Sequence, residues 1–387
     1  MGQDFVEVSI NVLKLIVIFL LIVQAVPVLV WLERRGSALI QNRLGPNRVG
    51  WMGLMQLLAD AVKFLFKEEF VPEKGIKVLY YAAPVVALIP ATLAFCAIPL
   101  GHPIKVEAFH MLGHSWGPYV FPFQGYDMNI GIVFVLGVSS LAAYSLLLAG
   151  WGSGNKYSLL GALRASSQVI SYELALGLAV VSMVLFYGTL NLSEMIRQQQ
   201  GVLVFQAFGQ MISVPWLPNW GIFYQPIAAI LFFAATFAES NRLPFDLPEG
   251  EAELVAGFHV EYGGFKMLLF FIGEYGHMMV ASALMTVFFF GGYQIPFVNP
   301  DEVYQNLTLS LGSSTLASVV TGFLHHLVFF LKFAIFLWIF IQVRWTLPRF
   351  RYDQLMDLGW RTMLPWALGN TMVTALVIFI LNRSVGG

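Results

Sequence analysis

The densest group of titratable side chains lies in residues 239–261, between two apolar stretches. It holds one arginine, Arg242, and six acids, which are Glu239, Asp246, Glu249, Glu251, Glu253 and Glu261. Apolar residues such as Leu254 and Phe258 interleave with them. Burial and neighbouring carboxylates both raise carboxyl pKa values, so some of these acids would hold protons near neutral pH. The segment predicts a proton-storing network; a solvated acidic loop is the alternative.

A short helix is expected within this segment. Pro248 suits a first helical turn, with Asp246 near the N-cap and Gly257 beyond the end. Glu249 and Glu253 then lie one turn apart on one face, where their repulsion is strong if the dielectric is low.

Ionisable residues inside apolar stretches form the second candidate group. Glu173 and Glu274 each lie within such a stretch, and Tyr275 and His277 follow Glu274. A charged side chain at the centre of a membrane costs about 2.5–3.5 kcal/mol, so these positions indicate a function. Lys332 fits the same argument less strongly. The alternative, for the polar residues around Glu173 above all, is hydrogen bonding between packed helices.

A basic, turn-rich run, LERRGSALIQNRLGPNRVG, follows the first apolar stretch. Adjacent Arg34 and Arg35 would ordinarily anchor the end of a membrane helix. The loop beyond them and a second basic segment, RFRYDQL, are expected to dock a partner through Arg43, Arg48, Arg349 and Arg351.

The elements that position these residues are membrane helices. The 387-residue chain is 58% hydrophobic and 11% charged, whereas soluble domains average about 25% charged residues. Runs of roughly 20 apolar residues can span a bilayer. We expect an all-α polytopic fold of about eight spans in one domain: residues 8–32, 78–100, 128–150, 161–187, 222–238, 265–291, 323–343 and 363–381.

Residues 51–66 are apolar but are not expected to span the membrane. Gln56, Asp60, Lys63 and Lys67 follow one another at spacings of four, three and four, which places them on one stripe of a helix. Such a helix lies in the membrane interface. Its polar stripe either is solvated or faces a cavity shared with a partner.

The distribution of basic residues predicts the orientation. If the first, third, fifth and seventh connections face the cytoplasm, they and their helix ends hold sixteen Lys and Arg residues, against three on the other side. By the positive-inside rule, both termini are then outside.

The single cysteine, Cys96, cannot by itself hold an iron–sulfur cluster or a structural zinc. The sequence has no glycine-rich nucleotide motif. The histidine pairs His110/His114 and His325/His326 lack nearby ligands to complete a metal site. No metal is expected on this chain, and if redox chemistry happens near it, the metal and flavin centres are carried elsewhere.

Together these segments resemble the H subunit of bacterial NADH–quinone oxidoreductase, respiratory complex I. The similar stretches are ERR…QNRLGPNRVG (33–50), QLLADAVKFLFKE (56–68), GALRASSQVISYE (161–173), ESNRLPFDLPEGEAELVAGFHVEY (239–262), GEY (273–275) and RFRYDQLMDLGW (349–360). They occur in order along nearly the whole chain. The departures lie near residues 101–127, 200–219 and 294–321.

The resemblance implies a subunit of a proton-translocating NADH:quinone reductase in the bacterial inner membrane. Partner subunits would carry the FMN and the iron–sulfur clusters, and peripheral-arm subunits would enclose the quinone chamber with this chain. Small and antiporter-like membrane subunits, lipid and quinone are the other expected partners; no nucleic acid is expected. The quinone passage would involve Arg34, Asp60, Lys63, Arg242, Phe245 and Asp246. The proton path would involve Glu173, Glu239, Glu249, Glu251, Glu253, Glu261, Glu274 and Tyr275.

Two other classes of membrane protein remain as alternatives. The homologous subunit of a membrane-bound hydrogenase would keep the acidic loop without needing a quinone chamber, although LPEGEAELVAGFHVEY and GPNRVG favour the quinone enzyme. A secondary transporter would ordinarily show inverted repeats, and none is evident.

Overall fold

The computed structural model describes residues 2–107, 109–111, 114–116, 118–207, 210–246 and 257–385. Within these ranges, seven helical segments are long and apolar enough to cross a membrane. They are α1 (Gly2–Ile40), α3 (Lys77–Cys96), α4 with α5 (Gly131–Ser139 and Leu141–Gly152), α6 (Lys156–Tyr187), α11 (Gly264–Phe289), α13 (Ser314–Thr346), and α14 with α15 (Tyr352–Asp357 and Leu364–Val385). The apolar helix α9 (Pro226–Glu239) is shorter. The fold is therefore all-α and polytopic, as the sequence predicts.

Each expected span overlaps one of these helices, but several ends differ. Helix α1 continues past the expected residue 32 to Ile40, because ERRGSALI is rich in good helix formers, and the chain turns at Asn42 with a φ of 51°. Helix α13 begins at Ser314, where the Ser313 side chain caps the backbone N–H of Leu316. The third expected span is divided at Ser140 into α4 and α5.

The expected interfacial helix is α2 (Gln56–Phe66), preceded by the 3-10 turn η1 (Trp51–Gly53). None of the residues of α2 is buried. Its polar stripe is present, since Gln56 Nε2 donates to Asp60 Oδ1 over 3.1 Å and Lys63 Nζ lies 3.9 Å from the same oxygen.

Segments expected to be loops contain antiparallel hairpins. The pairs are β1 (Ile104–Val106) with β4 (Tyr119–Phe121), β2 (Phe109–Met111) with β3 (His114–Trp116), and β5 (Val202–Ala207) with β6 (Gln210–Pro218). These segments are rich in β-branched and aromatic residues, which favour strands. Short helices α7 (Leu192–Gln198), α8 (Gly221–Tyr224) and α12 (Pro300–Leu311) and the turn η2 (Gly257–His259) complete the connections.

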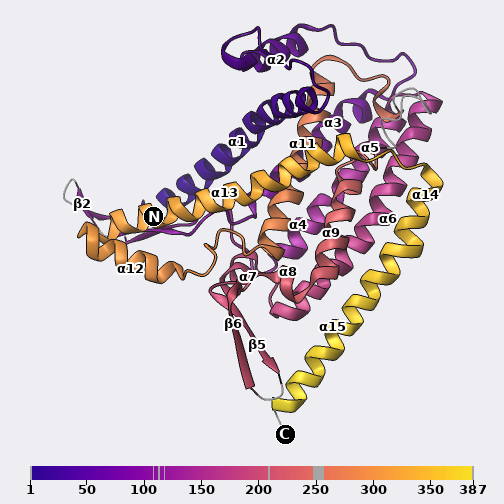
Figure 1. Ribbon diagram of the computed structural model, residues 1–387. Coiled ribbons are helices and arrows are strands. Elements are labelled where there is room, and N and C mark those ends of the chain that lie inside the picture. The colour runs from indigo at the N-terminus through magenta and orange to yellow at the C-terminus, as the bar shows by residue number, and fades with distance from the viewer. Residues whose placement is uncertain are drawn as a thin grey trace.

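Helix α11 is the centre of the bundle and packs against α3, α9, α13 and α1. Its approach to α3 depends on Gly273, where an added Cβ would lie 2.7 Å from the carbonyl oxygen of Ala87. Figure 1 shows α2 and α14 at one end of the bundle, and the β5–β6 hairpin and the C-terminus at the other. The basic segments 41–50 and 349–351 therefore share one end with α2.

Candidate functional site

The centre of the site is Glu33, which the extension of α1 places inside the helix bundle. Its side chain is buried. The carboxylate accepts hydrogen bonds from Arg242 Nη1 over 3.1 Å and from the Tyr275 hydroxyl over 2.6 Å, and it also pairs with Arg344. Residues from α1, α11, α13 and the turn after α9 therefore meet at one carboxylate.

Arg242 links this carboxylate to a second one. Its Nε lies 2.8 Å from Glu274 Oε1, and its guanidinium lies 4.0 Å from the centre of the Tyr275 ring. Burial alone would lower the pKa of Arg242, but Glu274, Tyr275 and Glu33 raise this pKa above its ordinary value. The cation is thus permanently charged.

We call Glu33, Arg242, Glu274, Tyr275 and Arg344 the ion network. It contains two carboxylates and two guanidiniums, so its formal charges balance. Balance matters because removing one member of a buried ion pair costs about 3–5 kcal/mol, through the charge left behind. Arg242, Glu274 and Tyr275 are predicted site residues, whereas Glu33 and Arg344 are not.

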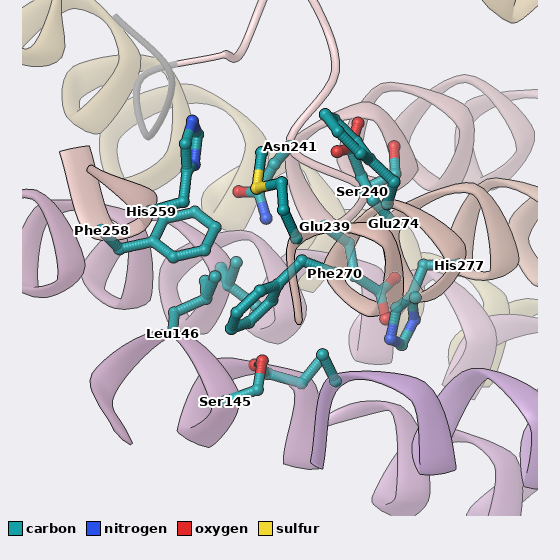
Figure 2. A pocket seen from close by; sticks show the side chains of 16 residues that line it. Ser145, Leu146, Glu239, Ser240, Asn241, Phe258, His259, Phe270, Glu274 and His277 are labelled. Carbon is teal, nitrogen blue, oxygen red and sulfur yellow. Dashed lines mark hydrogen bonds between the residues drawn. The ribbon is translucent and has the colours of Figure 1, made fainter. Parts of the chain in front are cut away.

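A cavity adjoins the ion network on the side of Glu274. Its volume is about 50 Å³, measured as the space open to the centres of water molecules. The walls come from α3, α5, α6, α9, η2 and α11, and they include Glu239, Asn241, His259, Glu274 and His277. Figure 2 shows Glu239 and His277 pointing toward one another at one end of this cavity, with Phe258 and His259 at the other.

The acids continue beyond the cavity to Glu173 on α6. The hydroxyl of Ser140, at the break between α4 and α5, donates a hydrogen bond to Glu173. The adjacent Ser139 hydrogen-bonds the Glu239 carboxylate, which also lies near Glu173. Glu239 thus lies near Glu173 on α6 and shares the cavity with Glu274 on α11.

The remaining predicted acids are placed differently. Glu261 lies apart from the cavity, where its Oε1 accepts a hydrogen bond from Asn155 Nδ2 over 2.8 Å. Glu249, Glu251 and Glu253, with the short helix expected after Pro248, lie outside the described residues.

The predicted quinone-passage residues fall into two groups. Arg34 Nη1 lies 2.6 Å from Asp60 Oδ2, which joins the end of α1 to α2, and Lys63 borders this pair. Phe245 is buried against Tyr172 and Phe350.

Asp246 and Arg349 are joined in one ion pair. Arg349 Nη2 donates to Asp246 Oδ2 over 3.0 Å. A residue predicted for the quinone passage and one predicted for docking are therefore direct neighbours.

The other predicted docking arginines are exposed. Arg43 and Arg48 lie on the turn-rich loop after α1, and Arg351 lies at the start of α14 next to Asp353. Arg35 folds this loop back onto α1, because its Nη2 donates to the carbonyls of Pro46 and Met52.

Lys332 is held by backbone carbonyl groups. Its ammonium donates to the carbonyls of Phe290, Gly292 and Gln294, just beyond the end of α11, over 2.8, 3.0 and 2.8 Å. It also lies over the ring of Trp220. The lysine therefore binds the carbonyl groups that follow the end of α11.

In the described part of the chain, the histidines have no set of metal-ligating side chains around them. His325 Nδ1 lies 2.8 Å from the Thr321 carbonyl and His326 Nδ1 lies 3.1 Å from that of Leu100. The side chains of His110 and His114 lie outside the described part. Among the residues described, no group of three or more His, Cys, Asp or Glu is arranged to hold a metal ion.

Fold and site together define a multi-pass membrane protein with a buried ion network and a line of carboxylates leading away from it. The sequence model of the family described as "NADH dehydrogenase" matches residues 13–375. A protein of Bdellovibrio bacteriovorus, named as the H subunit of NADH-quinone oxidoreductase, is 66% identical over 380 residues, which cover 98% of this chain and 99% of the relative.

Two further relatives are named as the same subunit. One from Cytophaga hutchinsonii is 42% identical and covers 90% of each chain; one from Geobacter sulfurreducens is 41% identical and covers 96% of this chain and 97% of its own length. The chain belongs to this NADH dehydrogenase family, as an H subunit of NADH–quinone oxidoreductase. It is a membrane subunit of a multi-subunit enzyme.

Proposed function

We propose that this subunit forms part of the quinone chamber and couples quinone reduction to proton translocation. The observation that carries the proposal is the continuity between the ion network and the acids Glu239 and Glu173. A hydrogenase-type complex is the less favoured alternative, because the relatives are named as quinone oxidoreductase subunits.

The ion network is suited to respond to a change of charge nearby. Reduction of a quinone takes up electrons and protons, so the charge beside the chamber changes during the reaction. In a site of low dielectric, such a change alters the proton affinity of neighbouring carboxylates strongly. Arg242 contacts both carboxylates of the network, so a change in the charge of one carboxylate alters the electrostatic environment of the other.

The quinone passage would lie between α1 and α2, beside Arg34, Asp60 and Lys63. The apolar residues of α2 support this position, because Leu58, Val62 and Leu65 are at least half exposed. They offer a surface for an isoprenoid tail or for a partner subunit. Phe245, Arg242 and Asp246 would border the inner end of the passage.

The exposed arginines Arg43, Arg48 and Arg351, with Arg349, would bind the peripheral-arm subunits that carry the terminal iron–sulfur cluster. Small and antiporter-like membrane subunits would pack on the lateral faces. The basic end of the bundle would face the bacterial cytoplasm, with both termini on the periplasmic side. A reporter fused to the C-terminus that is active only in the cytoplasm would contradict this orientation.

The experiment compares Glu239→Gln and Glu173→Gln with the unaltered complex. Each change keeps the shape and hydrogen bonds of the side chain but removes its titrating proton. We expect the NADH:quinone rate and proton pumping to fall together, while NADH oxidation by an artificial acceptor is unchanged. Glu194→Gln on α7, where Glu194 pairs with Arg197 at the surface, is the matched control. Full pumping in both test variants would overturn the proposed path.

A further inference from the structure

His277 is a buried imidazole beside the carboxylates of the proposed path. It lies on α11 one turn after Glu274 and is 8% exposed. Its Nε2 has no hydrogen-bond partner among the described residues. A ring nitrogen in the interior is ordinarily satisfied by protein or by water, so this atom requires a partner from the cavity that it faces.

The cavity has room for that partner. Its volume of about 50 Å³ exceeds the roughly 10–15 Å³ that one water molecule needs. Its walls carry Asn241 Oδ1, which also lacks a partner in the described part of the chain, and the carboxylate of Glu239. A site with several polar partners and this volume is able to hold water.

The titratable groups that line the cavity with His277 come from three elements. Glu239 is on α9, Glu274 is on the same helix as His277, and His259 is on η2. Arg242 lies behind Glu274, to which it is paired. Imidazole is the side chain that both takes up and releases a proton near neutral pH, and here it lines one cavity with two carboxyl groups.

We propose that His277 relays protons between Glu239 and Glu274 across water in this cavity. A proton leaves the carboxylic acid of Glu239 through water and adds to the imidazole, which becomes imidazolium. The imidazolium then releases a proton to the carboxylate of Glu274, and the neutral ring is restored. No electron moves, and the reverse sequence is equally balanced.

This relay has a consequence for the ion network. A proton on Glu274 neutralises the carboxylate that pairs with Arg242, so the guanidinium is left with Glu33 as its charged partner. The inference rests on the proposed function, because it assumes that Glu239 and Glu274 carry protons during turnover.

The test uses His277→Gln and His277→Asn in the assembled complex, with Glu239→Gln in parallel. Both amides keep a hydrogen-bonding group in the cavity but do not titrate. We expect quinone-linked proton pumping to fall by about tenfold or more, within the range of a lost proton-transfer group, and its dependence on pH to flatten, because neither amide titrates. NADH oxidation by the artificial acceptor should be unchanged. His326→Gln, which changes a histidine on α13 outside the cavity, is the matched control.

Three outcomes would overturn the relay. The first is wild-type pumping in both amide variants while Glu239→Gln is impaired, which leaves the proposed function intact. The second is an equal loss at every pH, which indicates a structural role. The third is wild-type pumping in all variants, Glu239→Gln included, which removes the proposed function as well.

Discussion

Arg349 and Asp246 form an ion pair, 3.0 Å long, between the segment before α14 and the turn after α9. The Asp246 side chain is 8% exposed and that of Arg349 is 36% exposed, so the arginine covers a carboxylate that water scarcely reaches. The pair thus connects the basic surface proposed for docking with the interior.

Arg349→Ala should lower the stability of the complex. A hydrogen bond to a buried charged group contributes about 1.5–3 kcal/mol, and its loss should lower the unfolding temperature of the detergent-solubilised complex. Arg351→Ala is the control, because Arg351 and Asp353 are largely exposed and such pairs contribute little. Equal effects of the two changes would refute the special role of Arg349.

The pairing of Glu33 with Arg344 predicts compensation between two substitutions. Glu33→Gln leaves two guanidiniums facing one carboxylate, and breaking a buried pair in this way costs about 3–5 kcal/mol. Glu33→Gln with Arg344→Gln removes one charge of each sign and should recover part of the lost assembly. The measurement is the amount of intact complex on native gels. No recovery in the double variant would contradict a balanced network.

The Arg34–Asp60 pair predicts separate effects on stability and on quinone binding. The Arg34 side chain is 47% exposed, so Asp60→Asn should change stability by no more than about 0.5–1 kcal/mol. If the pair borders the quinone passage, the KM for quinone should rise while the KM for NADH stays constant. An unchanged KM for quinone would indicate that the quinone passage does not run beside this pair.

Gly161 provides a test of how η2 shapes the cavity. A Cβ at Gly161 would lie 2.6 Å from the Cα of Gly257, so Gly161→Ala must displace the turn that carries Phe258 and His259. We expect a loss of about 1–3 kcal/mol and slower pumping. Gly177→Ala on the same helix is the control, since the added Cβ would have no described atom within 4 Å apart from its chain neighbours and the backbone of its own helix. Equal stability and equal pumping rates in the two variants would show that the close contact between Gly161 and Gly257 does not shape the cavity.

The sequence predicts the fold and part of the site. Long apolar runs specify membrane helices through their length alone, and Glu173 and Glu274 stand out because ionisable groups are rare within such runs. Glu33 does not stand out, because it is next to Arg34 and Arg35 at what looks like the end of a span. Only the continuation of α1 to Ile40 brings it inside the bundle.

The ion network could not be found from local spacing. Glu33 and Arg344 are 311 positions apart in the sequence, and their meeting depends on how α1 and α13 pack. The roles of Ser139 and Ser140, at the α4–α5 break, could not be found from local spacing either. In the sequence they are ordinary small residues of an apolar run. Only the packing of α6 and α9 brings Glu173 and Glu239 to them. The paired strands beyond the helices do not stand out either, because their segments are short.

Lys332 has a further consequence for the medium in which the enzyme works. Three carbonyl oxygens converge beyond the end of α11, an arrangement to which a sodium or potassium ion would also be attracted. Here the cation is an ammonium fixed to α13 by its own side chain, so it does not exchange with the surrounding solution. The contacts at this end of α11 are therefore independent of the ionic composition of the surrounding solution.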